Sequence, residues 1–178
     1  MNPNPTEARS LGSLIAQIAA ELGDAGTGAL AELRRLTPDD PGGPAFWRVV
    51  VTRLDPELPA GGDPRDAALR RWAVILRALA ALDGLHNPGR RLGAALAEAG
   101  VSELRLNKLL RTSGEPLFDQ VRAVTHQLAT AAAPVDLTGL ARLVLSDGQP
   151  HEQAVRQTIA NDYYAVIFHT ERNPKEND

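Results

Sequence analysis

Apolar residues recur along this chain at spacings of three and four. This feature constrains the fold more than any other, because it is the period of an α-helix with one buried face. No stretch alternates apolar and polar residues for long enough to indicate a sheet. Only Val49, Val50 and Val51 leave a strand as an alternative, within residues 45–54, which otherwise have the pattern of a short, mostly buried helix. We therefore expect an all-α protein, a compact multi-helix bundle of about eight or nine helices.

Glycine, proline and aspartate mark where these helices begin and end. A long helix is expected to start with Asp63 as its N-cap and Pro64 in its first position, and the wide apolar stripe around Trp72 predicts that it is central. Other helices are expected at residues 6–22, 27–36, 115–133, 137–145 and 151–168, and two short ones between 89 and 111. We expect one helical domain over residues 1–178, with about 1–8 and 170–178 disordered.

The charge of the chain is unevenly distributed. The formal net charge is −3, yet residues 65–130 carry ten basic and six acidic side chains, and acidic side chains outnumber basic ones in both flanking segments. The middle segment is therefore the candidate for electrostatic contact with a phosphate backbone. The alternative is that arginine is simply abundant in this chain and that these residues form a solvated face.

Residues 89–111, GRRLGAALAEAGVSELRLNKLLR, concentrate this positive charge. Ser102 is placed to cap a helix in which the leucines at 106, 109 and 110 share one face. Opposite that face lie three cations at three-residue steps, which we call the basic stripe: Arg105, Lys108 and Arg111. This arrangement could follow successive phosphates of one strand.

Two further arginines, Arg90 and Arg91, stand at the start of the preceding short helix, where the helix dipole disfavours cations. Their position indicates a partner that offsets this unfavourable placement. Arg122, on the following helix, could extend the same basic surface.

The same hairpin is compatible with two other functions. A turn at Gly100 between two short helices matches a sequence-reading helix-turn-helix, in which Glu103, Asn107 and Arg111 would contact base edges. A protein–protein scaffold with solvated arginines is the third hypothesis. A backbone-binding subunit predicts weak, salt-dependent binding without sequence preference, a regulator predicts tight binding to one operator, and a scaffold predicts no binding.

Residues suited to catalysis do not form a recognisable motif. The chain has no cysteine, its four histidines stand in separate segments, and it contains no Walker loop, G-x-S-x-G or G-x-G-x-x-G. We expect no enzymatic activity, no cofactor and no metal site. No apolar run approaches 18 residues and the N-terminus does not have the pattern of a signal peptide, so we expect no membrane association and a cytoplasmic location.

Five segments carry a resemblance to a known family when they are taken in order. They are ALAELRRLTPDDPGGPAFWRVV, RRLGAALAEAGVSELRLNKLLRT, FDQVRAVTHQLA, VDLTGLARLVL and IANDYYAV. Together they resemble the small subunit of the type I-E CRISPR surveillance complex, Cascade, known as CasB, over about residues 29–168.

The resemblance implies an all-α, non-catalytic protein that is present in two copies within Cascade. It implies other Cascade subunits, the guide RNA and the target DNA as partners, and a role in stabilising the R-loop, including its displaced strand. Guide pairing would then supply the sequence information, so backbone contacts would suffice for this subunit. The basic residues that match the family are Arg34, Arg35, Arg105, Arg111 and Arg122, and the charge argument adds Arg91 and Lys108.

Overall fold

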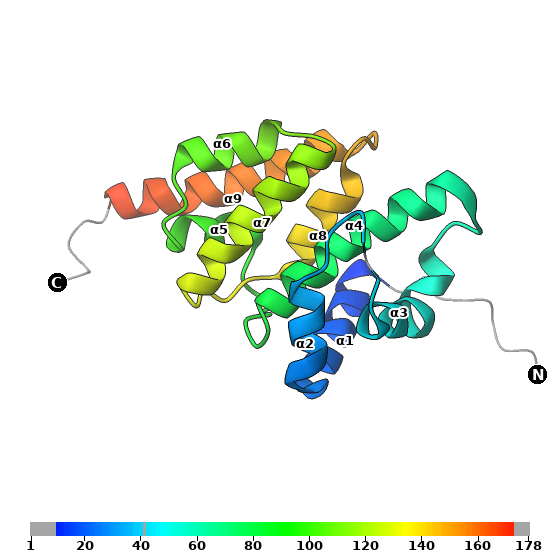
Figure 1. The fold of residues 1–178 in the computed structure, drawn as a ribbon. Helices are drawn as coiled ribbons and strands as arrows, with labels where there is room; N and C mark the ends of the chain where they lie inside the picture. Colours follow the sequence, from blue (N-terminus) through cyan, green and yellow to red (C-terminus); the bar gives the residue numbers. More distant parts are fainter. Residues whose placement is uncertain (1–9, 41, 173–178) are drawn as a thin grey trace, which may run out of the picture.

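The computed structural model describes residues 10–40 and 42–172, with the backbone alone at 171 and 172. Within these ranges the chain forms nine α-helices and no strand, which confirms the predicted all-α fold (Figure 1). The helices are α1 (Leu11–Asp24), α2 (Gly26–Arg34), α3 (Pro44–Val49), α4 (Gly62–Ala81), α5 (Leu92–Glu98), α6 (Glu103–Arg111), α7 (Glu115–Thr130), α8 (Leu137–Ser146) and α9 (Glu152–Arg172). A π-helical turn, Val50–Leu54, and a 3₁₀ turn, Asp55–Glu57, follow α3, so the valines at 49–51 belong to helical structure.

Several helix boundaries differ from the sequence prediction, and the start of α4 and the end of α9 are the two that change a stated expectation about capping or order. The N-cap of α4 is Gly61, and Asp63 lies in the first turn of the helix instead of capping it. The reason is Gly62, whose φ of +68° lets the chain turn into the helix before Pro64. At the other end, α9 continues to Arg172 and so enters the segment that was expected to be disordered from residue 170. Residues 1–8 and 173–178, also expected to be disordered, lie outside the described residues.

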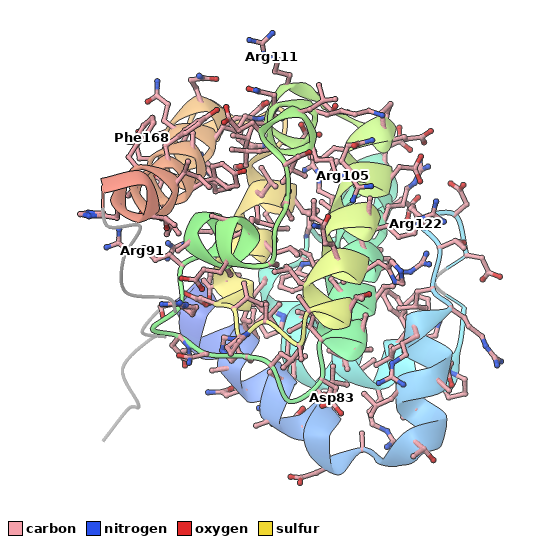
Figure 2. All side chains as sticks on the ribbon, turned by 90° about the vertical axis from the view of Figure 1, so that its left-hand side faces the viewer. Asp83, Arg91, Arg105, Arg111, Arg122 and Phe168 are labelled. Atoms are coloured by element: carbon pink, nitrogen blue, oxygen red, sulfur yellow. The ribbon has the colours of Figure 1, made fainter. Side chains whose placement is uncertain are left out.

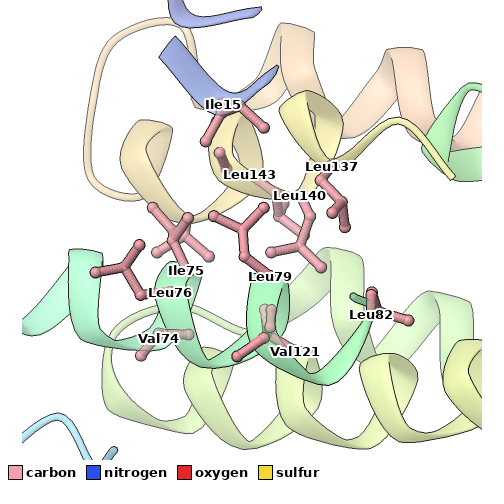
Figure 3. Packing of buried hydrophobic residues seen from close by; sticks show 14 of the residues in the cluster. Ile15, Val74, Ile75, Leu76, Leu79, Leu82, Val121, Leu137, Leu140 and Leu143 are labelled. Carbon is pink, nitrogen blue, oxygen red and sulfur yellow. The ribbon is translucent and has the colours of Figure 1, made fainter. Parts of the chain in front are cut away.

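The central position of α4 is confirmed by its burial. Trp72 is only 4% exposed, and most of the C-terminal half of α4 is buried. Figure 3 shows Ile75 and Leu79 beneath the leucines of α8, while Val74 lies on the side of Val121 from α7. One hydrophobic cluster joins these helices to α1, α2, α3, α5, α6 and α9. Because α4 is covered on both sides, only a narrow part of its surface is left for function.

Gly93 allows α5 and α9 to approach each other closely. A Cβ atom at Gly93 would lie 2.1 Å from the carbonyl oxygen of Ile159 and 2.8 Å from the backbone nitrogen of Tyr163, so a side chain there would require α9 to shift. Tyr163 is 2% exposed, and its hydroxyl donates a hydrogen bond of 2.6 Å to the carbonyl oxygen of Val101. These contacts fix α9 against α5 and against the turn that leads into α6.

Arg156 connects the beginning of α9 to the end of α6. It is 6% exposed and donates to the carbonyl oxygens of Leu110 and Thr112, the latter at 2.8 Å. It also forms ion pairs with Asp147 at 3.3 Å and with Glu152 at 2.6 Å. Since the last carbonyls of a helix have no partner within the helix, this guanidinium satisfies groups at the end of α6 and fixes their position.

Candidate nucleic-acid interface

The helix that carries the basic stripe is defined at both ends. Gly100, with a φ of +71°, reverses the chain after α5, and the hydroxyl of Ser102 accepts a hydrogen bond of 3.4 Å from the backbone N–H of Arg105, which confirms Ser102 as the cap of α6. Leu106 and Leu109 are buried. The opposite face of α6 is therefore exposed, as the spacing predicted.

All three residues of the basic stripe, Arg105, Lys108 and Arg111, are exposed. Nη1 of Arg105 donates to Oε1 of Gln127 on α7 at 2.7 Å. Among the described residues, no carboxylate forms an ion pair with any member of the stripe. Lys108 and Arg111 stand in the last turn of α6, where cations also stabilise the helix through its dipole. That stabilisation does not neutralise them, so the stripe keeps its charge for an external anion.

Elsewhere many arginines have a carboxylate partner within the chain. Ion pairs with carboxylates involve Arg53, Arg65, Arg70, Arg90, Arg91, Arg122 and Arg156. These arginines therefore have an acidic partner within the chain. The three cations of the basic stripe have none in the part of the chain that the structure describes.

The two arginines before α5 find their partners within the protein. Arg90 pairs with Glu98, and Nη1 of Arg91 lies 3.0 Å from Oδ1 of Asp162 on α9. Glu98 and Asp162 are therefore partners within the chain that offset the unfavourable placement of these two arginines at the helix start. Figure 2 shows Arg91 on the side of α9, away from Arg105 and Arg122. Arg91 is thus not brought together with the basic stripe.

Arg34 and Arg122 lie on a groove that the sequence did not reveal. It has a volume of about 850 Å³ and is walled by α4, α7 and the segment after α2. Nε of Arg34 donates to the carbonyl oxygen of Ala80 at 2.9 Å, and Arg122 makes a loose ion pair of 3.4 Å with Asp119. Arg35, the C-cap of α2, is exposed and is not part of the groove lining.

Arg77 is the residue of this groove that the sequence analysis missed. Its Nη1 donates to the carbonyl oxygen of Leu36 at 3.1 Å. Burial, and secondarily the positive charge of Arg122, lowers the pKa of Arg77 below its usual range, while Asp119 opposes the shift. The seven-residue spacing of Arg70 and Arg77 on the polar face of α4 was a signal, but nothing in the sequence shows that the segment after α2 covers it.

The face of α6 proposed for base reading in a helix-turn-helix is partly occupied by α9. The hydroxyl of Tyr164 donates to Oε2 of Glu103 at 3.2 Å. Desolvation and this carboxylate raise the pKa of Tyr164 above its usual range. Glu103 is thus held by a neighbouring helix, and no contact in the structure favours the helix-turn-helix function.

Neither a metal site nor a membrane span is found in the regions with assigned structure. No group of three or more histidine, cysteine, aspartate or glutamate side chains is placed to hold a metal ion there. None of the described helices is long and apolar enough to cross a membrane.

Comparison with known proteins identifies a family for most of the chain. Residues 29–164 match the family described as CRISPR-associated protein Cse2. A search of curated proteins found no match. The family match covers most of the chain and includes α3 to α8, all of the basic stripe and the groove arginines at 34, 77 and 122. The chain therefore belongs to the CRISPR-associated protein Cse2 family, also called CasB, the small subunit of type I-E Cascade.

Proposed function

We propose that this protein is a non-catalytic subunit of Cascade that stabilises the R-loop by contacting nucleic-acid backbones. The observation that carries the proposal is the basic stripe on α6, whose three exposed cations have no carboxylate partner among the described residues. Membership of the Cse2 family supports the assignment to Cascade. The guide RNA, the target DNA, other Cascade subunits and a second copy of the chain are the proposed partners.

Backbone contact is the chemistry that this arrangement supports best. Base pairing with the guide reads the sequence, so the subunit has to hold the strands and not to identify them. Arg105 and Arg111 present planar guanidinium groups that can bind a phosphate with two hydrogen bonds each, and Lys108 between them adds a mobile point charge. Arg34, Arg35 and Arg122 would widen the contact, whereas Arg91, which pairs with Asp162, lies on the side of α9 away from the stripe (Figure 2) and would contribute less.

A matched pair of variants tests the role of the stripe. The double variant Lys108→Ala, Arg111→Ala removes two exposed cations from α6, and the control Arg48→Ala, Arg142→Ala removes two exposed cations from α3 and α8. Binding of random-sequence single- and double-stranded DNA is measured by fluorescence anisotropy across a salt series. The α6 variant should bind both more weakly, and its plot of log K against log salt should become shallower by about 0.7 to 0.9 per lost phosphate contact.

Reconstituted Cascade gives the decisive readout. Complexes assembled with the wild type, the α6 variant or the control are compared for the lifetime of the R-loop on a matched target. We expect the α6 variant to assemble normally and to shorten that lifetime, while the control behaves as the wild type does. Equal R-loop lifetimes for all three complexes would contradict the proposed function.

A further inference from the structure

The groove between α4 and α7 differs from the stripe in shape. A volume of about 850 Å³ falls within the range of sites that enclose a small ligand. A double helix cannot enter such a space, whereas a nucleotide whose base is unpaired can. The walls combine cations with apolar surface, which includes the half-buried aromatic ring of Phe118. This is the composition that a phosphate joined to a planar base requires.

The two ends of the groove differ in charge. At one end Arg34, Arg77 and Arg122 face a single carboxylate, Asp119. At the other end two carboxylates flank Arg70: Asp39 at 2.6 Å and Glu115 in contact with the same nitrogen. An anion is therefore attracted to the first end and repelled from the second.

The first end is also pre-organised. Arg34 and Arg77 each use one N–H group to bond a backbone carbonyl, which fixes the direction of the guanidinium and leaves its other donors for a ligand. Burial, and secondarily the positive charge of Arg122, lowers the pKa of Arg77 below its usual range, and Asp119 opposes this shift. A phosphate between these side chains would supply a negative charge.

Helix α7 stands between the basic stripe and the groove. Arg105 reaches Gln127 on α7, while Arg122 and His126 of the same helix line the groove. Figure 2 shows Arg105 beside α7 and Arg122 on the other side of that helix. A strand that lies along the stripe can thus pass over α7 and place a nucleotide in the groove.

We propose that this groove binds one unpaired nucleotide of a single strand, with its phosphate at Arg34, Arg77 and Arg122 and its base against the ring of Phe118. This inference rests on the proposed function and narrows it. The stripe contacts any backbone, whereas the groove selects a strand that has left its duplex.

A variant that fills the groove without changing charge tests the inference. Ala123 is an exposed residue of α7 on the groove wall, and Ala154 is an exposed residue of α9 outside it. Fluorescence anisotropy is measured with an oligothymidylate of about 12 nucleotides, a length within the range of single-strand sites, and with a duplex of equal length. Ala123→Trp should weaken oligothymidylate binding about fivefold or more, the weak end of what one stacked base contributes, and should leave duplex binding unchanged. Ala154→Trp should change neither.

The outcomes separate this inference from the proposed function. Unchanged oligothymidylate binding by Ala123→Trp overturns the inference, even if Lys108→Ala, Arg111→Ala still weakens binding to both DNAs. If Ala123→Trp loses oligothymidylate binding and the α6 variant does not, the result contradicts the proposed role of the basic stripe instead. The double variant Arg34→Ala, Arg122→Ala should reduce oligothymidylate binding more than Arg48→Ala, Arg142→Ala does, and an equal reduction overturns the phosphate assignment.

Two competitors identify the source of the ligand. Thymidine 5′-monophosphate should displace the oligothymidylate only weakly, because it lacks the contacts with the stripe. If it binds as tightly as the oligothymidylate, the groove takes a free nucleotide and the inference about a strand is wrong. The second competitor is an oligoglutamate peptide. If it binds the wild type but not Ala123→Trp, and both proteins bind the oligothymidylate equally, the ligand of the groove is an acidic protein segment and the inference about a strand is wrong.

Discussion

Arg156 provides the sharpest stability prediction, because its partners are buried with it. Replacing Arg156 with methionine keeps much of its volume and removes every hydrogen bond that it donates. Asp147, 5% exposed, would then keep only the backbone N–H of Gly114 at 2.8 Å as a donor to its side chain, and the carbonyl oxygens of Leu110 and Thr112 would lose their donor. An uncompensated buried charge left by such a change typically costs about 3–5 kcal/mol.

This loss is large compared with the whole stability of a domain, which is about 5–15 kcal/mol. With a urea m-value of about 2 kcal/mol/M, the midpoint of unfolding should fall by roughly 1.5–2.5 M. Urea unfolding is followed by far-ultraviolet circular dichroism, which reports helix content, and is fitted as a two-state transition. Arg142→Met, on the exposed face of α8, is the control and should change stability by no more than about 0.5 kcal/mol.

A double-mutant cycle tests the stated cause. If the loss comes from the bare charge of Asp147, then Arg156→Met combined with Asp147→Asn should be less destabilised than the sum of the single variants, by about 1–3 kcal/mol. A loss below about 1 kcal/mol in Arg156→Met, or strict additivity in the cycle, would refute the reasoning.

Two further predictions concern α9. Gly93→Ala should destabilise the protein by about 1–3 kcal/mol or more, because the new methyl group meets the carbonyl oxygen of Ile159. The control Gly28→Ala, in α2 where a methyl group meets no neighbouring atom, should be neutral or stabilising in the same urea titration. Tyr163→Phe should cost about 1–3 kcal/mol through the unpaired carbonyl of Val101. Burial raises the pKa of Tyr163, so its contribution to stability is complete below about pH 10 and is lost as pH rises further. Between about pH 9 and 11 the urea midpoint of Tyr163→Phe should therefore fall less than that of the wild type. An equal fall in both proteins would contradict this.

Local rules predicted most of the fold. The helical period identified the amphipathic helices, and Ser102 was recognised as a cap because capping depends on residues within one turn. The start of α4 was wrong by a short distance, since the positive φ of Gly62 could not be read from a pattern that favours Asp63 and Pro64. Local sequence shows where a helix is favoured, but the entry of the chain into it depends on a backbone angle.

The site was predicted only where it lies on one helix. The basic stripe follows from the spacing within residues 105–111, and its exposure is confirmed. The partner of Arg91 comes from α9, and the wall of the groove beside Arg77 comes from the segment after α2, so neither could be found locally. Arg156 did leave a signal, because it precedes Ile159 by three residues and shares the buried face of α9.

The dependence of α5 and α6 on α9 has a consequence for the order in which the chain becomes native during synthesis. Translation proceeds from Gly93 to Tyr163 over about 70 residues, which takes roughly 4–14 seconds at 5–20 residues per second. Throughout that interval the face of α5 that receives α9 stays uncovered, and the end of α6 lacks the guanidinium that completes it. A nascent chain released or stalled before Tyr163 therefore presents to the cell's chaperones and proteases an apolar surface that the finished protein never shows.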